Sequence, residues 1–264
     1  MAFLEPEALH NLQLLELASR LGGMNSRSEV VPQLLGAFEG RRIVGVASLR
    51  PSLVLDSGAG EALLDVWMPF LDTLPSGLIK SGWDAASNLR ERLAARNRGF
   101  LLDRRETAYV LRAEQTVQRD PPSGARLRTA VEGDLEALVR AARASLREEG
   151  RPDPFDGDPP GFRRWVRGRL PRARVVAVAG QVLFAGYVDV RRQEGWLVQG
   201  VYTFPEARRR GLAAAGIAGI CQEAFASGAE HVQLAVVKGN RAAEGLYEGL
   251  GFEPFGQLRT LLFL

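Results

Sequence analysis

Residues 196–216 read WLVQGVYTFPEARRRGLAAAG, and this stretch decides which fold the chain can adopt. An apolar strand is predicted up to Thr203, Pro205 ends it, and the arginines at 208–210 lead directly into a helix of small residues. The first turn of such a helix offers unpaired backbone N–H groups and a partial positive charge, which suit a phosphate group. A solvated basic turn before a core helix is the alternative interpretation of these residues taken alone.

The regions on both sides predict a mixed sheet with helices on its faces. Strands are expected at 125–129, 173–179, 182–190, 196–203 and 231–237, and a last strand or hairpin is expected from Phe252. Helices are expected at 134–146, 161–170, 209–226 and 240–250. A meander of strands followed by strand–helix–strand elements is typical of an α/β (α+β mixed-sheet) domain.

A second motif lies downstream, where residues 240–252 read NRAAEGLYEGLGF. Together the two stretches resemble the GCN5-related N-acetyltransferase (GNAT) superfamily. The acyl-CoA motif of that family is Arg or Gln, two residues, Gly, one residue, then Gly or Ala, and Arg208, Gly211 and Ala213 fill it in register. In the second motif of the family an Asn contacts the cofactor and a Tyr follows seven positions later, as Asn240 and Tyr247 do here. The resemblance implies the GNAT fold over residues 125–264.

The resemblance also implies acetyl-CoA as acyl donor and no metal ion. Gly200 interrupts an apolar strand, which is typical of a bulge or a close backbone approach. In relatives a bulge there separates the central strand from its neighbour, so that free backbone groups pair with the pantetheine arm. The implied cofactor-binding residues are Val201, Tyr202, Thr203, Arg208, Arg209, Arg210, Gly211, Leu212, Ala213, Ala214 and Asn240.

For catalysis the resemblance points to Tyr247 as the general acid that protonates the departing thiolate. Some relatives carry a Glu on the central strand, whereas residues 197–199 are Leu-Val-Gln, which puts a carboxylate base from this strand in doubt. Gln199 could instead orient a water or the amine, and Glu194 or Asp189 could relay a proton. His231 is expected to have a surface or packing role, and Cys221 to be a small core residue.

The N-terminal part is a separate prediction. The run Arg-Asp-Pro-Pro-Ser-Gly breaks the periodic pattern, so we expect a domain at 1–118, a linker at 119–124 and the GNAT domain at 125–264. Residues 34–50 share a strand–turn–strand pattern with 175–191, and both Asn88 and Asn240 precede a Gly-Phe pair by the same spacing. The first half has no acyl-CoA motif. It therefore fits a degenerate GNAT-like repeat that serves as a scaffold, a pocket wall or a regulatory site.

Composition limits the cellular context. With 264 residues, 46% of them hydrophobic, the chain is not intrinsically disordered, and its single cysteine cannot form an intramolecular disulfide. Neither a secretion signal nor a membrane span is recognised, so we expect a cytoplasmic monomer or homodimer without a membrane partner. All but two of the 34 basic residues are arginines, yet the net charge is only +3, and nucleic acid is not an expected partner.

Two further charged segments keep alternatives open. The arginine-rich segment 161–174 could bind an anionic substrate or form a solvated basic face. The loop after the first helix of the GNAT half could attract a cationic amine or simply be solvated; its acidic residues are Glu148, Glu149, Asp153, Asp156 and Asp158.

These observations give two functional hypotheses. The first is an acetyl-CoA-dependent N-acetyltransferase in which a small-molecule or peptide amine attacks the acyl donor directly in a ternary complex. The second is a non-catalytic acyl-CoA-binding sensor or regulatory module.

Overall fold

The computed structural model of the chain describes residues 1–22, 32–117, 119, 122 and 124–264. Its α-helices are α1 (Ala8–Gly22), α2 (Glu61–Leu71), α3 (Trp83–Ala94), α4 (Leu135–Glu148), α5 (Pro159–Gly168), α6 (Leu212–Ala226) and α7 (Arg241–Glu248). Its strands are β1 (Gln33–Glu39), β2 (Arg42–Arg50), β3 (Val54–Leu55), β4 (Gly77–Gly82), β5 (Phe100–Arg112), β6 (Arg126–Thr129), β7 (Ala173–Val178), β8 (Gln181–Arg191), β9 (Trp196–Thr203), β10 (His231–Val237) and β11 (Glu253–Phe263). Short 3-10 turns are η1 (Glu5–Glu7), η2 (Ala113–Gln115), η3 (Glu132–Asp134), η4 (Leu170–Arg172) and η5 (Pro205–Ala207).

The strands form two sheets. The small sheet has the order β1-β2-β3, and the large sheet has the order β4-β11-β5-β10-β9-β8-β7-β6. Pairing is parallel between β9 and β10 and antiparallel along the β6–β9 meander. The expected mixed sheet is therefore confirmed.

By its internal contacts the chain divides into two compact units. The first unit comprises Met1–Ala108, Ala235–Asn240 and Pro254–Leu264, and the second comprises Tyr109–Leu234 and Arg241–Glu253. The predicted linker at 119–124 includes 120, 121 and 123, which lie outside the described residues. A division of the chain into two modules at that linker stays a prediction.

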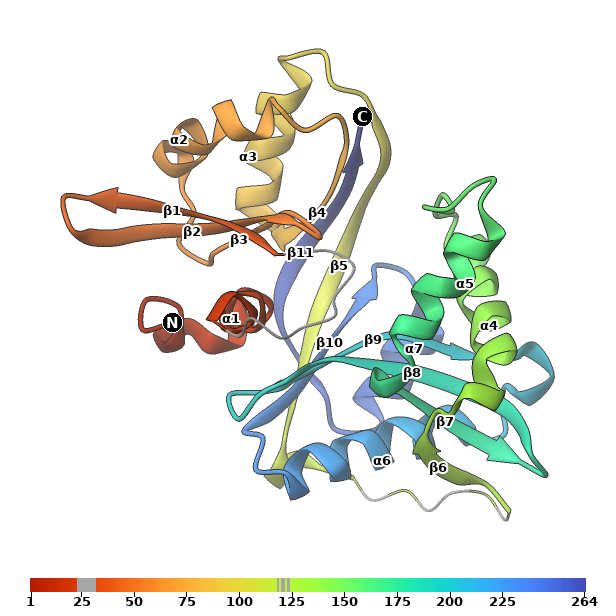
Figure 1. The fold of residues 1–264 in the computed structure, drawn as a ribbon. Coiled ribbons are helices and arrows are strands. Elements are labelled where there is room, and N and C mark those ends of the chain that lie inside the picture. Colours follow the sequence, from red (N-terminus) through yellow and green to blue (C-terminus); the bar gives the residue numbers. More distant parts are fainter. Residues whose placement is uncertain (23–31, 118, 120–121, 123) are drawn as a thin grey trace. The chain divides into compact units, whose positions relative to one another are not determined.

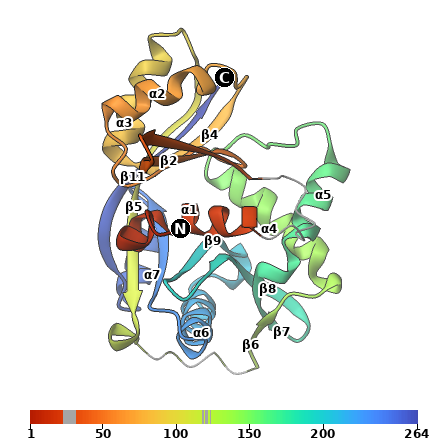
Figure 2. The same cartoon turned by 60° about the vertical axis from the view of Figure 1, so that its left-hand side comes forward.

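The second unit has helices on both faces of its sheet, with α4 and α5 on one face and α6 on the other (Figures 1 and 2). Ala185 and Tyr187 of β8 share a buried cluster with Phe162 of α5. On the opposite face the Phe184 ring packs against Gly216 of α6. A Cβ atom added at Gly216 would be only 2.4 Å from this ring. Because glycine carries no side chain, α6 packs directly against β8 at this position.

The first unit has its own apolar core, in which the C-terminal strand β11 takes part (Figure 1). Leu261 of β11 pairs in register with Ile79 of β4, and both are fully buried. They pack with Trp67 of α2, Leu89 of α3 and Phe263 of β11. The last segment of the chain is therefore a single long strand of this core, where the sequence left a strand or a hairpin open.

The two halves of the chain repeat one order of elements. The order β1-β2-β3-α2-β4-α3-β5 in the first half matches β7-β8-β9-α6-β10-α7-β11 in the second. This order fits the expected GNAT-like repeat, although Asn88 lies inside α3 whereas Asn240 precedes α7. Within the described parts of the chain no helix is both long and apolar enough to span a membrane.

Candidate functional site

The central strand β9 carries the bulge that Gly200 predicts. Ala185 and Tyr187 of β8 pair with Tyr202 and Gln199, so β9 holds one extra residue between these two pairs. Gly200 has a φ of 58°, a left-handed conformation that glycine adopts without strain. The bulge therefore lies at the position expected from the sequence.

Beyond the bulge β9 is paired on one side only. The parallel ladder joins Val232 to Trp196 and Gln233 to Leu197, and no pair joins β10 to a later residue of β9 in the described parts of these strands. On the other side the ladder to β8 continues to Thr203. The segment 198–203 thus has an edge open to β-type pairing with an extended ligand.

The helix α6 begins after the turn η5 and a short loop that follow this open segment. Gly211 caps the helix in a left-handed conformation with a φ of 76°, and helical hydrogen bonding starts with the Ala215 N–H donating to the Gly211 carbonyl, at 3.0 Å. This cap explains why the helix begins at Leu212 and not at residue 209. The N–H groups of the first turn, which includes Ala213 and Ala214, have no intrahelical acceptor and can receive an anion.

The three arginines before α6 do not share one environment. Arg208 turns to Glu148 at the end of α4, and its Nη2 lies 2.8 Å from each carboxylate oxygen. Its Nε donates to the Thr203 carbonyl at 3.0 Å. Arg209 and Arg210 are exposed. The basic charge available to a phosphate at this helix end is therefore that of Arg209 and Arg210, with Arg208 paired to a carboxylate.

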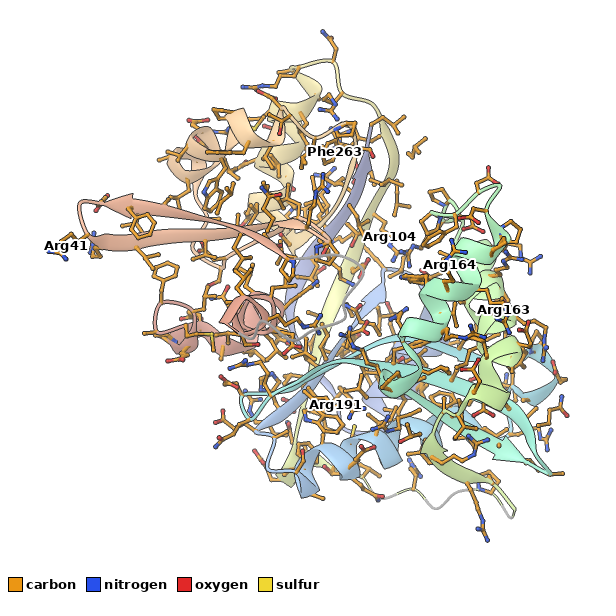
Figure 3. All side chains as sticks on the ribbon, in the orientation of Figure 1. Arg41, Arg104, Arg163, Arg164, Arg191 and Phe263 are labelled. Carbon is orange, nitrogen blue, oxygen red and sulfur yellow. The ribbon has the colours of Figure 1, made fainter. Side chains whose placement is uncertain are left out.

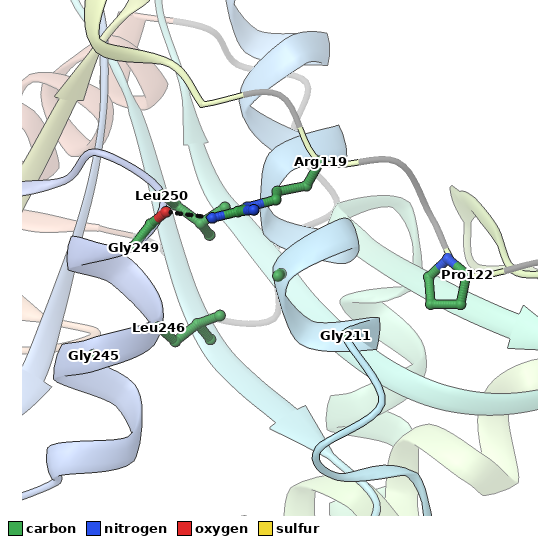
Figure 4. Close-up of a pocket in the computed structure, with 8 residues that line it drawn as sticks. Arg119, Pro122, Gly211, Gly245, Leu246, Gly249 and Leu250 are labelled. Atoms are coloured by element: carbon green, nitrogen blue, oxygen red, sulfur yellow. Dashed lines mark hydrogen bonds between the residues drawn. The ribbon is translucent and has the colours of Figure 1, made fainter.

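A pocket of about 320 Å³ lies beside the same helix end (Figure 4). Gly211 and Ala214 of α6 form one wall, and α7 with the segment that follows it forms the other. Arg119 lines the pocket and donates from Nη2 to the Gly249 carbonyl at 3.2 Å. The remaining lining residues are Pro122, Gly245, Leu246 and Leu250.

Tyr247 projects from α7 into the interior of the second unit. Its side chain is 6% exposed, and its ring meets that of Phe252 edge to face, with 5.7 Å between centroids. Burial, with a smaller contribution from Cys221, raises the pKa of the Tyr247 phenol. The phenol therefore keeps its proton at neutral pH, as the starting state of a general acid requires. Burial likewise raises the pKa of Cys221 to about 12, so this thiol stays protonated and fits the predicted core role.

The candidate bases near β9 are held by other groups. Asp189 accepts from Arg169 at 2.8 Å, and Glu194 accepts from Arg192 at 2.7 Å in the β8–β9 turn. Gln199, half-buried, lies opposite Tyr187 in the strand register. The side chain of Gln199 is thus adjacent to the bulge, while both carboxylates are engaged in ion pairs.

The structure also gives positions for His231 and Asn240, about which the sequence made predictions. His231 is buried at the start of β10 against the Gly195 backbone, and burial, followed by the charge of Arg112, lowers its pKa to about 4. Its packing role is consistent with the sequence prediction. Asn240 is exposed in the turn before α7 and belongs to the first unit, whereas the other predicted site residues belong to the second.

The arginine-rich helix α5 forms ion pairs with nearby carboxylates. Arg163 and Arg164 project from α5 (Figure 3), with Arg163 2.6 Å from Glu136 and Arg164 3.7 Å from Asp158. Arg169, just after α5, stacks on the Tyr187 ring at 4.0 Å. These pairs reduce the positive charge that α5 presents.

In the described parts of the chain no group of three or more His, Cys, Asp or Glu side chains could hold a metal ion.

Sequence reasoning missed the role of Glu148 as the partner of Arg208, because it placed this residue among the acidic residues of a loop. In the structure it is the last residue of α4, and its carboxylate also accepts the Tyr202 hydroxyl at 2.8 Å. The pair of an Arg in the acyl-CoA motif and an acidic residue 60 positions upstream leaves no local signal in the sequence.

Comparisons with known proteins agree with the fold described above. Residues 135–252 match the family model described as "Acetyltransferase (GNAT) family". No curated protein matches the sequence.

Solved structures share the fold over nearly the whole chain. A Drosophila protein has a TM-score of 0.71 at 14% identity and covers 95% of this chain and 87% of its own. A GCN5-related N-acetyltransferase from Kribbella flavida has a TM-score of 0.56 at 18% identity, over 96% of this chain and 93% of its own. A tandem GNAT protein from the clavulanic acid biosynthesis pathway has a TM-score of 0.54 at 13% identity, over 98% and 95%. At these identities the likeness shows the fold.

Proposed function

We propose that this chain transfers an acetyl group from acetyl-CoA to an amine, because residues 135–252 match the model of the acetyltransferase (GNAT) family. The acceptor we propose is a small-molecule or peptide amine that attacks the thioester directly while both substrates are bound. The observation that carries the proposal is the unpaired edge of β9 at 198–203, which a short loop connects to the capped start of α6.

The residues present fit the proposed donor. The extended pantetheine arm would pair with the backbone of Val201, Tyr202 and Thr203, as an added strand pairs with a sheet edge. The Thr203 carbonyl already accepts from Arg208, so the backbone groups of Val201 and Tyr202 are the main candidates for this pairing.

The phosphate end of the donor would lie at the start of α6. Backbone N–H groups of Gly211, Leu212, Ala213 and Ala214 would receive the pyrophosphate, and the exposed Arg209 and Arg210 would supply charge. The pocket between α6 and α7 would take part of the nucleotide, with Arg119 as a further partner for phosphate. We keep Asn240 as a proposed cofactor contact from the family motif.

The chemistry follows from the thioester. The amine lone pair attacks the carbonyl carbon, and negative charge develops on the carbonyl oxygen. A backbone N–H near Val201 would stabilise this charge, an interaction worth about 3 kcal/mol when one such donor is lost. As the carbon–sulfur bond breaks, the departing sulfur takes a proton from the Tyr247 hydroxyl, while Gln199 orients the amine beside the bulge. The proton that the nitrogen loses on forming the amide passes to solvent, and solvent returns a proton to the Tyr247 phenolate.

Binding of the donor is the first experiment. Saturating acetyl-CoA should raise the unfolding midpoint of the full chain, since a ligand that binds only the folded state stabilises it by mass action. Arg209→Ala combined with Arg210→Ala should reduce this shift. If neither acetyl-CoA nor longer acyl-CoAs change the midpoint, the proposal fails.

A non-catalytic acyl-CoA sensor is the second candidate. Two observations favour this function. Tyr247 is buried. Asp189 and Glu194 are engaged in ion pairs, so no free carboxylate adjoins the bulge among the described residues. Acyl-CoA binding without release of free thiol, across a broad panel of amines, would support this second function.

A further inference from the structure

The carboxylate of Glu148 joins two side chains of the acyl-CoA segment. Arg208 approaches it from Nη2 at 2.8 Å to both oxygens, and the Tyr202 hydroxyl donates to Oε1 at 2.8 Å. The hydrogen bonds from Arg208 and Tyr202 outweigh the effect of burial and lower the pKa of Glu148, so the group is ionised at neutral pH. All three residues belong to the second unit.

Arg208 extends this contact to the backbone of the loop. While Nη2 is held by Glu148, Nε donates to the Thr203 carbonyl at 3.0 Å, and the guanidinium carbon lies 5.5 Å from the centre of the Tyr202 ring. The turn between these residues is closed by the Ala207 N–H donating to the Phe204 carbonyl at 2.9 Å. Arg208 thus connects the end of β9, the loop before α6 and the end of α4.

From this arrangement we infer that Glu148 is a positioning residue for acyl-CoA binding, acting through Arg208 and Tyr202. It fixes the direction of the Arg208 side chain, which in turn fixes the loop that presents Gly211 and the first turn of α6. The inference rests on the proposed function, because it assigns to Glu148 a role in holding that same site.

The alternative is that Glu148 competes with phosphate for Arg208. The two possibilities predict opposite changes in the affinity for acyl-CoA when Glu148 loses its charge. If Glu148 positions the loop, replacing it with the uncharged Gln weakens acyl-CoA binding, because the charge-assisted contact of Arg208 Nη2 with the carboxylate becomes a weaker one. If it competes with phosphate, the same change frees Arg208 and tightens binding.

Isothermal titration calorimetry of the full chain with acetyl-CoA shows whether the Kd rises or falls. We expect Glu148→Gln to raise the Kd about threefold to tenfold, a modest change because both partners are partly exposed. Arg208→Gln should raise the Kd by a similar factor. The double variant should equal the single ones, because both changes remove one contact. Glu149→Gln, at the next position and paired with Arg151, is the matched control and should leave the Kd unchanged.

Tyr202→Phe keeps the test decisive if a charge-removing variant folds poorly. It deletes only the hydroxyl that contacts Glu148, and we expect it to raise the Kd about twofold in the wild-type background and not at all beside Glu148→Gln. Thermal unfolding of each variant separates loss of fold from loss of binding.

Three results would overturn the inference: a tighter Kd in Glu148→Gln, an unchanged Kd in a folded Glu148→Gln, or fully additive effects of the two charge changes. Failure of the wild-type chain to bind acetyl-CoA is a different result, which would reject the proposed function itself.

Discussion

The ring of Tyr187 lies directly against the backbone of Gly200, across the β8–β9 ladder. A Cβ atom at Gly200 would be 3.0 Å from the Tyr187 Cδ2, and the φ of Gly200 is 58°. Both the left-handed backbone and the close ring require glycine at this position. The bulge in β9 therefore depends on one residue.

Gly200→Ala tests this dependence. We expect it to lower the free energy of unfolding by about 1–3 kcal/mol, because it adds backbone strain and crowds Tyr187. We also expect weaker acetyl-CoA binding, since the edge of β9 would change shape. Denaturant unfolding and calorimetry measure the two effects, and an alanine variant with wild-type stability and affinity would contradict this role of the bulge.

Close packing of α6 on β8 gives a second prediction. Gly216→Ala would place a Cβ atom 2.4 Å from the Phe184 ring, so we expect a loss of about 1–3 kcal/mol in unfolding free energy. Gly245→Ala in α7 is the matched control, because nothing lies within 4 Å of its Cβ position and alanine favours a helix. Equal unfolding free energies for the two variants would show that α6 can shift away from β8.

The first unit contains a buried carboxylate with a pH-dependent contribution to stability. Glu106 is 1% exposed, 2.7 Å from Lys80 and 2.9 Å from Arg104, and it accepts from Thr260 at 2.7 Å. Burial alone would raise its pKa, but Lys80, Arg104 and Thr260 lower it to about 2. Because the pKa is lower when folded than the ordinary 4.5, the stabilisation is complete above pH 4.5. It is lost as the pH falls from 4.5 toward 2.

Glu106→Gln should therefore flatten the pH dependence of unfolding between 4.5 and 2. At neutral pH we expect it to cost about 2–4 kcal/mol, since Lys80 loses its buried partner. Chemical unfolding at a series of pH values measures both effects. The same slope in wild type and variant would show that Glu106 does not carry this acid sensitivity.

The two halves of the chain differ in what their corresponding loops can bind. Before α2, the Asp56 carboxylate accepts the N–H groups of Val46 at 2.6 Å and Gly58 at 2.8 Å. The Leu53 N–H donates to the Leu78 carbonyl at 2.8 Å and the Leu55 N–H donates to the Ser81 hydroxyl at 2.9 Å, so these backbone groups are already engaged. We therefore expect one acetyl-CoA bound per chain. A calorimetric stoichiometry of two would show that the first unit also binds the donor.

Much of this site could be predicted from local sequence. Gly200 acts through its own backbone conformation, so the bulge is visible in the residues themselves, whereas the helix expected from 209 begins only at Leu212, after the cap at Gly211. The engagement of Arg208 by Glu148 could not be predicted, because it depends on where α4 ends in space. The same holds for β11, whose alternating apolar residues indicate a strand but do not specify that it pairs with β4.

Acyl transfer at the end of β9 is tested most directly by the release of free thiol from acetyl-CoA with a panel of amines. We expect amine-dependent release by the wild-type chain and a loss of about 100-fold or more in Tyr247→Phe, in line with the usual contribution of a general acid. The variant should still bind acetyl-CoA. Turnover that is equal in wild type and Tyr247→Phe, or no amine-dependent release by a chain that binds acetyl-CoA, would contradict the account.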